Sequence, residues 1–198
     1  NLYPFEEISL NRKNNEKICI ENIDIGGPTM IRAAAKNYKN VIILSDPESY
    51  LPFIKEFEKK MSVSDTMRKN FAIKAFETTS YYESLISNWF NKENSDPCQV
   101  KSSIPLKKIS KLRYGENPHQ TGSFYGYGDH KVKQINGKDL SFNNIYDLES
   151  AVSLANEFSE NCCVIVKHGN PCDVACGKIQ PKAYTKAMEW YEVRAIGG

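Results

Sequence analysis

The chain has 198 residues, of which 26 are basic and 24 acidic, for a formal net charge of +2 at pH 7. Its hydrophobic content of 40% is typical of a soluble globular protein with a real core. The charges form no long block of one sign, and the apolar runs are far shorter than the roughly 20 residues of a membrane helix. We therefore expect neither a nucleic-acid nor a membrane partner.

The first residues, NLYPFEE, contain no initiator Met and no secretory signal, so we expect the chain to start inside a longer, cytoplasmic sequence. The chain contains six cysteines, and in a long, core-rich sequence we expect reduced thiols rather than disulfides. His168, Cys172 and Cys176 leave a zinc site open as an alternative, although no second matched pair of ligands accompanies them. We predict no metal site.

Short apolar runs alternate with helical patterns in the first part of the chain, which predicts an α/β fold around a mostly parallel sheet. An aromatic-bearing pattern after Ser64 predicts a long helix capped by that residue, with its aromatic side chains packed in the core. The other elements expected here are a strand at 18–25, a helix at 29–40, a buried strand at 41–44 and a helix at 48–60.

The polar stretch 91–111 is typical of a connection between domains, and we place the boundary near residue 100. The two predicted parts are therefore 1–100 and 101–198. In the second part we expect a loop at 113–120, a strand around 123–127, a turn at Asn136-Gly137, a helix at 147–159 and a strand at 162–166.

Asp24 and the pair Gly26-Gly27 lie between a predicted strand and the following helix. Backbone N–H groups at a helix start can hold a phosphate, but a Gly-Gly pair is equally typical of a tight turn. Arg32 and Lys36 are four residues apart and share a helix face. Asp24 and Lys36 together would supply a proton acceptor and a cation to one site.

The segment 113–120, RYGENPHQ, concentrates an Arg, a Tyr, a His and amide side chains in a predicted loop. An Arg fork suits a phosphate and a Tyr ring can cover a base, although a polar surface turn is the alternative interpretation. Lys167-His168 follows the last predicted strand, where ligand sites of open α/β sheets lie. Such a pair can act in acid–base and oxyanion chemistry.

Five segments carry a resemblance to a known family. In combination, and in this order and spacing, they resemble the bifunctional formyltransferase and inosine monophosphate cyclohydrolase family. The segments are NLYPF at 1–5, ENIDIGGPTMIRAAAKN at 21–37, LRYGENPHQ at 112–120, LSFNNIYDLESA at 140–151 and VIVKHGNPC at 164–172.

The resemblance implies a partial cyclohydrolase domain of the methylglyoxal-synthase-like type over 1–100. It implies the start of a cytidine-deaminase-like transformylase region over 101–198, in a homodimer. The implied catalytic residues are Tyr3, Asp24, Lys36, Lys167 and His168. The implied substrate-binding residues are Asn1, Asp24, Ile25, Arg113, Tyr114, Asn144 and His168.

The implied reactions are the last two steps of purine biosynthesis. A formyl group passes from the cosubstrate 10-formyltetrahydrofolate to an aminoimidazole carboxamide ribotide, and the product closes to inosine monophosphate. His168 would take the proton of the attacking amine, while Lys167 would stabilise the oxyanion. Neither step requires a metal or redox cofactor, and the partners are ribonucleotides and folate.

Three departures from the family pattern stand beside this resemblance. The family's opening segment and most of its transformylase region are absent from the sequence. Asp173 occupies a position where a Gly is usual, and residues 190–196 do not follow the family pattern. We therefore expect the isolated chain to be inactive, and keep two alternatives: a segment that only binds nucleotide, or one that serves only dimer assembly.

Overall fold

The structure is a computed structural model that describes residues 1–11, 13–92, 100–127 and 134–195, with the backbone alone for 190–195. The described residues form two compact units, one mainly of residues 1–107 and one mainly of residues 108–125 and 134–195. Helices and strands are both present, which confirms the mixed content expected of an α/β protein.

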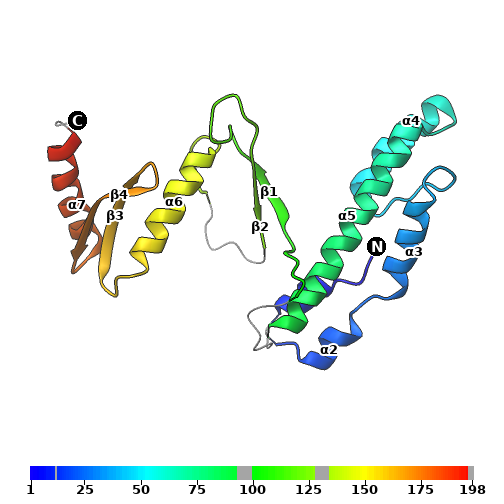
Figure 1. Cartoon of the computed structure of the whole chain (residues 1–198), viewed down its shortest axis with the longest axis horizontal. Coiled ribbons are helices and arrows are strands. Elements are labelled where there is room, and N and C mark those ends of the chain that lie inside the picture. The colour runs from blue at the N-terminus through cyan, green and yellow to red at the C-terminus, as the bar shows by residue number, and fades with distance from the viewer. Residues whose placement is uncertain (12, 93–99, 128–133, 196–198) are drawn as a thin grey trace. The chain divides into compact units, whose positions relative to one another are not determined.

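The first unit is built on one long helix (Figure 1). This helix, α5, begins as predicted, because the Ser64 hydroxyl accepts a hydrogen bond from the Met67 N–H at 3.3 Å. The elements of the unit are α1 (Phe5–Leu10), α2 (Glu16–Glu21), α3 (Gly26–Lys36), η1 (Pro47–Ser49), α4 (Tyr50–Lys60) and α5 (Asp65–Asn91).

Two small hydrophobic clusters lie along α5. The first comprises Phe5, Cys19, Tyr82 and Leu85, and the second comprises Ile31, Ala35, Ala72 and Ala75. Leu2 packs against both clusters, so the first residues of the chain are held beside α3 and α5. The prediction that the aromatic positions of the long helix serve packing is confirmed by Phe71 and Tyr82, which are buried.

The parallel sheet expected in this part is not found among the described residues. Where a strand was predicted at 18–25, Asn15 caps α2 by accepting a hydrogen bond from the Ile18 N–H at 3.0 Å. The segment 41–44 forms no strand in the described part of the chain. Ile43 packs instead against the second cluster. Packing against a helix therefore explains why this segment is apolar, although it is not a strand of a sheet.

The second unit consists of two small sheets and two helices (Figure 1). Strands β1 (Lys107–Lys111) and β2 (Ser123–Gly126) form one sheet. Strands β3 (Asn161–Lys167) and β4 (Asn170–Gly177) form an antiparallel hairpin. Helices α6 (Phe142–Ala155) and α7 (Gln180–Ala195) pack against that hairpin.

The predicted strands at 123–127 and 162–166 are confirmed, but two expectations for this unit are wrong and one strand was not predicted. The predicted helix at 147–159 begins earlier, because Ser141 caps it, and β1 lies in the stretch expected to be a connection. Strand β4 was missed because Asn-Pro is typical of a loop. In the register, Ile165 opposes Asp173 and Val166 opposes Pro171, which leaves Cys172 as a bulge where a proline is tolerated.

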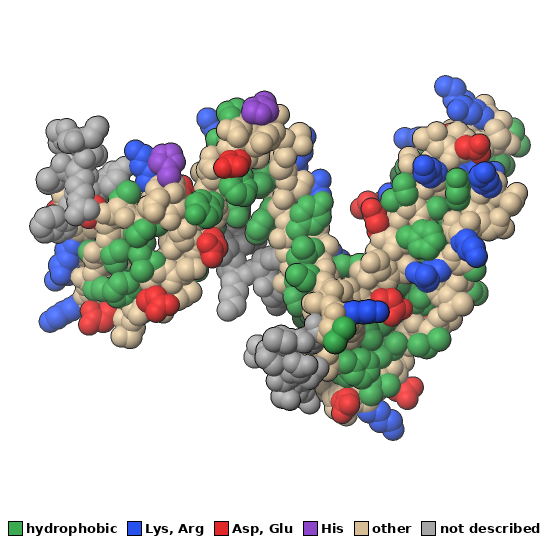
Figure 2. Space-filling model, in the orientation of Figure 1, with side chains coloured by type: hydrophobic (Ala, Val, Ile, Leu, Met, Phe, Trp, Pro, Cys, Tyr) green, Lys and Arg blue, Asp and Glu red, His purple; other side chains and the backbone are tan. Residues whose placement is uncertain are grey.

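No helix in the described ranges combines the length and apolarity needed to cross a membrane. Cys19, Cys162, Cys163 and Cys176 are free thiols. Figure 2 shows basic side chains interspersed with acidic and hydrophobic ones on the visible face of the first unit, as expected from a net charge of +2.

Candidate functional site

The Asp24 carboxylate joins two segments of the first unit that are distant in sequence. One oxygen accepts a hydrogen bond from the Gly27 N–H at 2.7 Å, and the other accepts one from the Tyr3 N–H at 3.3 Å. Asp24 therefore caps α3 from outside the helix and anchors the first residues of the chain at the same time. Tyr3 and Asp24, two predicted catalytic residues, lie side by side.

A tyrosine from α5 fixes the backbone of Asp24. The Tyr82 hydroxyl accepts a hydrogen bond from the Asp24 N–H at 2.8 Å and donates one to the Asn22 carbonyl at 3.2 Å. Burial raises the pKa of Tyr82, so its hydroxyl keeps its proton at neutral pH. The sequence pattern indicated only a packing role for this residue, and nothing in its spacing signals the contact.

The two glycines that follow Asp24 differ in their surroundings. A Cβ on Gly27 would lie 2.5 Å from a carboxylate oxygen of Asp24 and 2.8 Å from Leu2, whereas a Cβ on Gly26 would meet nothing within 4 Å. Gly27 therefore permits the close approach of Asp24 and Leu2. Gly26 presents open backbone at the start of α3, next to Ile25, which is 75% exposed.

Lys36 is the last residue of α3, whereas Asp24 lies just before the helix begins. At a rise of about 1.5 Å per residue, the ten steps from Gly26 to Lys36 span about 15 Å, so Asp24 and Lys36 lie at opposite ends of α3. A common site for these two residues stays a prediction. Lys36 and Asn1 are both exposed, and the structure joins neither to the pair Tyr3 and Asp24.

In the second unit, Arg113 and Tyr114 form a pair. The guanidinium lies over the Tyr114 ring, 4.9 Å from its centroid, and donates a hydrogen bond to the Tyr114 hydroxyl at 3.3 Å. The Ser141 hydroxyl and the guanidinium lower the pKa of Tyr114. The Arg113 N–H donates to the Leu140 carbonyl at 2.8 Å, so the loop is attached to the segment that leads into α6.

Asn144 lies in the capping box of α6. Its side-chain oxygen accepts hydrogen bonds from the N–H of Ser141 at 3.0 Å and from the Ser141 hydroxyl at 2.9 Å, while Ser141 caps the Asn144 N–H at 3.3 Å. This oxygen is therefore used within the fold. Any contact of Asn144 with a ligand falls to its side-chain NH₂ group.

Lys167 and His168 lie at the end of β3, where the chain turns into β4. Lys167 opposes Asn170, so His168 and Gly169 form a two-residue hairpin loop with φ of 54° and 72°. Positive φ at both central residues is the requirement of a type I′ turn. Both Lys167 and His168 are exposed.

Helix α6 brings the two predicted motifs of the second unit together. The residue that caps this helix, Ser141, contacts Tyr114. Asp147, six residues further along the chain, accepts a hydrogen bond from the Gly169 N–H at 2.6 Å. Six residues of helix separate these attachment points by about 9 Å along the axis. The Arg113-Tyr114 loop and the Lys167-His168 turn are thus fixed to adjacent turns of one helix.

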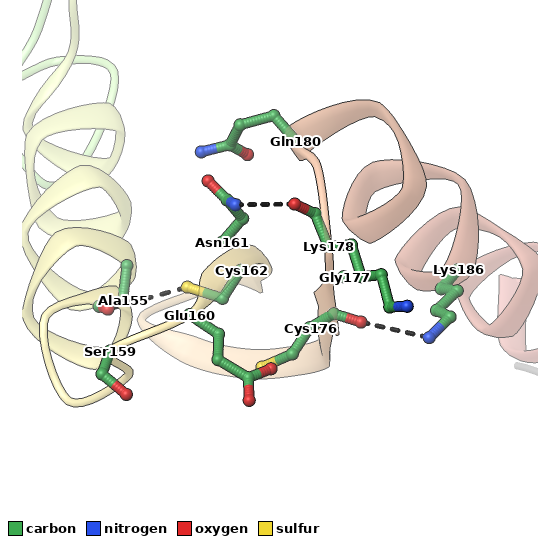
Figure 3. A pocket seen from close by; sticks show the side chains of 10 residues that line it. All are labelled: Ala155, Ser159, Glu160, Asn161, Cys162, Cys176, Gly177, Lys178, Gln180 and Lys186. Carbon is green, nitrogen blue, oxygen red and sulfur yellow. Dashed lines mark hydrogen bonds between the residues drawn. The ribbon is translucent and has the colours of Figure 1, made fainter.

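A large hollow of the second unit lies away from these residues. Figure 3 shows it between the end of α6, the open end of the β3–β4 hairpin and the start of α7, with Cys162 and Cys176 in its wall. Lys186 closes one side by donating to the Cys176 carbonyl at 3.2 Å. The His168 turn is at the other end of the hairpin, about 20 Å along a strand of seven residues.

A smaller hollow lies beside the Arg113-Tyr114 loop. It is lined by Leu112, Gly115, Glu116, Gln120, Thr121, Gly122, Ser123 and Phe142. This hollow offers a ligand space beside the loop that carries Arg113 and Tyr114.

Among the described residues no group of three or more His, Cys, Asp or Glu side chains is arranged to hold a metal ion. Cys172 and Cys176 are four residues apart on β4, about 13 Å, which is too far for one zinc ion to bind both.

A family model described as "AICARFT/IMPCHase bienzyme" matches residues 34–198. A protein named "Bifunctional purine biosynthesis protein PurH" from Caldicellulosiruptor saccharolyticus is 44% identical over 207 residues, covering 100% of this chain and 40% of the relative. Proteins of the same name from Aquifex aeolicus and Persephonella marina are 46% and 43% identical, with the same two coverages.

The chain belongs to the AICARFT/IMPCHase bienzyme family. It spans about 40% of the length of the curated relatives that it matches. The resemblance inferred from the five sequence segments is therefore confirmed at the level of the family.

Proposed function

We propose that the protein to which this chain belongs catalyses the last two steps of purine biosynthesis. The observation that carries the proposal is the family match over residues 34–198. The relatives support it, because their name states a bifunctional role in purine biosynthesis. The first reaction transfers a formyl group from 10-formyltetrahydrofolate to an aminoimidazole carboxamide ribotide. The second closes the formylated product to inosine monophosphate with loss of water.

The second unit is assigned to formyl transfer. The amine of the ribotide attacks the formyl carbon, the bond from that carbon to the folate nitrogen breaks, and the folate nitrogen leaves as tetrahydrofolate with a proton. His168 accepts the proton of the attacking amine and Lys167 stabilises the oxyanion. Arg113 and Tyr114, with Asn144 one turn into α6, hold the ribotide beside them, which is supported by the attachment of both motifs to α6.

The first unit is assigned to ring closure. The carboxamide nitrogen attacks the formyl carbon within the same molecule, so a bound near-attack conformer supplies much of the acceleration. Tyr3 and Asp24 exchange protons at one end of α3, with Asn1 and Ile25 contacting the nucleotide there. Lys36, at the other end of α3, acts as the main proton donor and acceptor on a ligand that extends along the helix, or is presented to the site by a second copy in a homodimer.

The remaining parts of the proposal follow from the resemblance. The first part, 1–100, belongs to a methylglyoxal-synthase-like domain and the second, 101–198, to a cytidine-deaminase-like region. Ribonucleotides and folate are the partners, the protein works in the cytoplasm, and the reactions need no metal or redox cofactor.

Separate loss of the two activities in the full-length protein tests the assignment. We expect Lys36→Ala to slow ring closure and spare formyl transfer, and His168→Ala to do the reverse, because the two residues belong to different units. Absorbance measures each conversion with its own purified substrate. Lys39→Ala, an exposed lysine three residues from Lys36, is the matched control and keeps both rates.

Loss of both activities in either single variant would contradict the division between units. If the full-length protein binds the ribotide but converts neither substrate, the alternative of a nucleotide-binding segment holds. If it forms dimers without any affinity for the ribotide, the assembly alternative holds.

A further inference from the structure

Asp147 is not among the predicted site residues, yet it contacts the turn that carries His168. It lies in the second turn of α6, and its Oδ1 accepts a hydrogen bond from the Gly169 N–H at 2.6 Å in a partly buried setting. A bond from an amide to a carboxylate is shorter and stronger than one between neutral groups. The contact joins two segments that are 22 residues apart.

The turn that Asp147 holds has an unfavourable backbone. His168 has φ of 54°, and a residue with a side chain adopts this left-handed conformation only where its surroundings impose it. Three contacts impose it here. Asp147 holds the next amide, the Tyr146 ring lies against Gly169 where a Cβ would overlap it, and the Asn170 side chain donates to the His168 carbonyl at 2.9 Å.

We propose that Asp147 is a positioning residue for formyl transfer, acting through the His168-Gly169 turn. It fixes the backbone that carries His168, so that the imidazole is presented to the reacting amine in one orientation. Because Asp147 and the Arg113-Tyr114 attachment share one helix, the same bond sets the spacing between the proton acceptor and the ribotide-binding pair. This inference rests on the role of His168 proposed above.

A purely structural role for Asp147 predicts something different. In that case its loss would loosen the second unit as a whole, so that KM for the ribotide would rise along with the fall in kcat for formyl transfer, or would change nothing measurable. A positioning role lowers kcat for formyl transfer alone, because the binding groups Arg113 and Tyr114 remain attached through Ser141. KM for the ribotide therefore reports on the fold of the second unit, while ring closure by the same full-length protein controls for the amount of folded first unit.

The test compares four variants of the full-length protein by steady-state kinetics of both reactions. Asp147→Ala removes the acceptor, and we expect kcat for formyl transfer to fall about 10- to 100-fold, as for a displacement of about 1 Å of a reacting group, while KM for the ribotide stays within about 2-fold. Asp147→Asn keeps an oxygen acceptor in place and retains kcat within about 3-fold. Glu149→Ala, two residues along α6 and without contact to the turn, is the matched control.

The fourth variant, Asp147→Glu, keeps the proposal testable if Asp147→Ala does not fold. It keeps the carboxylate but moves the acceptor by one methylene group, and we expect an intermediate fall in kcat with ring closure unchanged. Wild-type kcat in Asp147→Glu or Asp147→Ala, or equal losses in Asp147→Asn and Asp147→Ala, would overturn the proposal. Full formyl transfer by His168→Ala would instead overturn the proposed function of the second unit, so the two failures are distinguishable.

Discussion

Asp24 and Gly27 are joined by a hydrogen bond of 2.7 Å from the Gly27 N–H to the Asp24 carboxylate, and the same carboxylate lies where a Cβ of residue 27 would be. The bond and the close approach depend on each other, because any side chain at residue 27 would push the acceptor away. A residue proposed for catalysis is thus also the cap of α3, and changes next to it will alter both stability and rate.

Gly27→Ala is expected to destabilise the protein by about 1–3 kcal/mol, because the added methyl group overlaps Asp24 and Leu2. Gly26→Ala is the matched control. Its Cβ meets open space, so the helix-forming preference of Ala leaves stability unchanged or raises it by up to about 1 kcal/mol. Urea midpoints of the two variants check the difference, and equal midpoints would show that the approach of Asp24 to the helix is not as described.

Ser141→Ala is expected to cost about 0.5–2 kcal/mol, because it removes the cap that Ser141 supplies to the Asn144 N–H. It also removes the hydroxyl that contributes most to the lowered pKa of Tyr114, so that pKa moves back up towards its ordinary value of 10.0. An ultraviolet titration, with Tyr114→Phe to identify the signal, measures this shift. An unchanged pKa would mean that Arg113 alone sets the ionisation of Tyr114.

Tyr81 makes the free energy of unfolding depend on pH in the alkaline range. Burial first, and then its hydrogen bond of 2.5 Å to Glu6, raise its pKa well above the ordinary 10.0. The folded state therefore holds this proton more tightly than the unfolded state, so the stabilisation is complete below pH 10 and is lost as the pH rises above it. Tyr81→Phe is expected to flatten the fall of the free energy of unfolding above pH 10. Urea unfolding at pH 9 to 11 checks this slope, and identical slopes would contradict the assignment.

Gly169→Ala is expected to be more damaging than Gly137→Ala, although both glycines have positive φ. Ala at either position pays the cost of the left-handed backbone, about 1 kcal/mol. At Gly169 the new methyl group also overlaps the Tyr146 ring, whereas at Gly137 the nearest atom, on Gln134, is 3.7 Å away. Thermal unfolding midpoints measure the difference, and an equal loss at both positions would argue against close packing of Tyr146 on the turn.

The sequence predicted several local features correctly because their causes are local. The cap at Ser64, the helices at 50–60 and 65–91, and the strand at 161–167 follow from capping residues and apolar spacing within a short window. The family also followed from segments of sequence, and the family match confirms it. The roles of individual site residues remain predictions.

Only the tertiary structure decided which of these segments meet. The contact of Tyr3 with Asp24 spans 21 residues, and that of Asp147 with Gly169 spans 22. Neither contact leaves a signal in local spacing, because a hydrogen bond between distant segments depends on how the helices pack and not on the residues beside each partner. The same packing placed Ile43 against a helical cluster instead of in a strand, and Lys36 lies at the far end of α3 from Asp24.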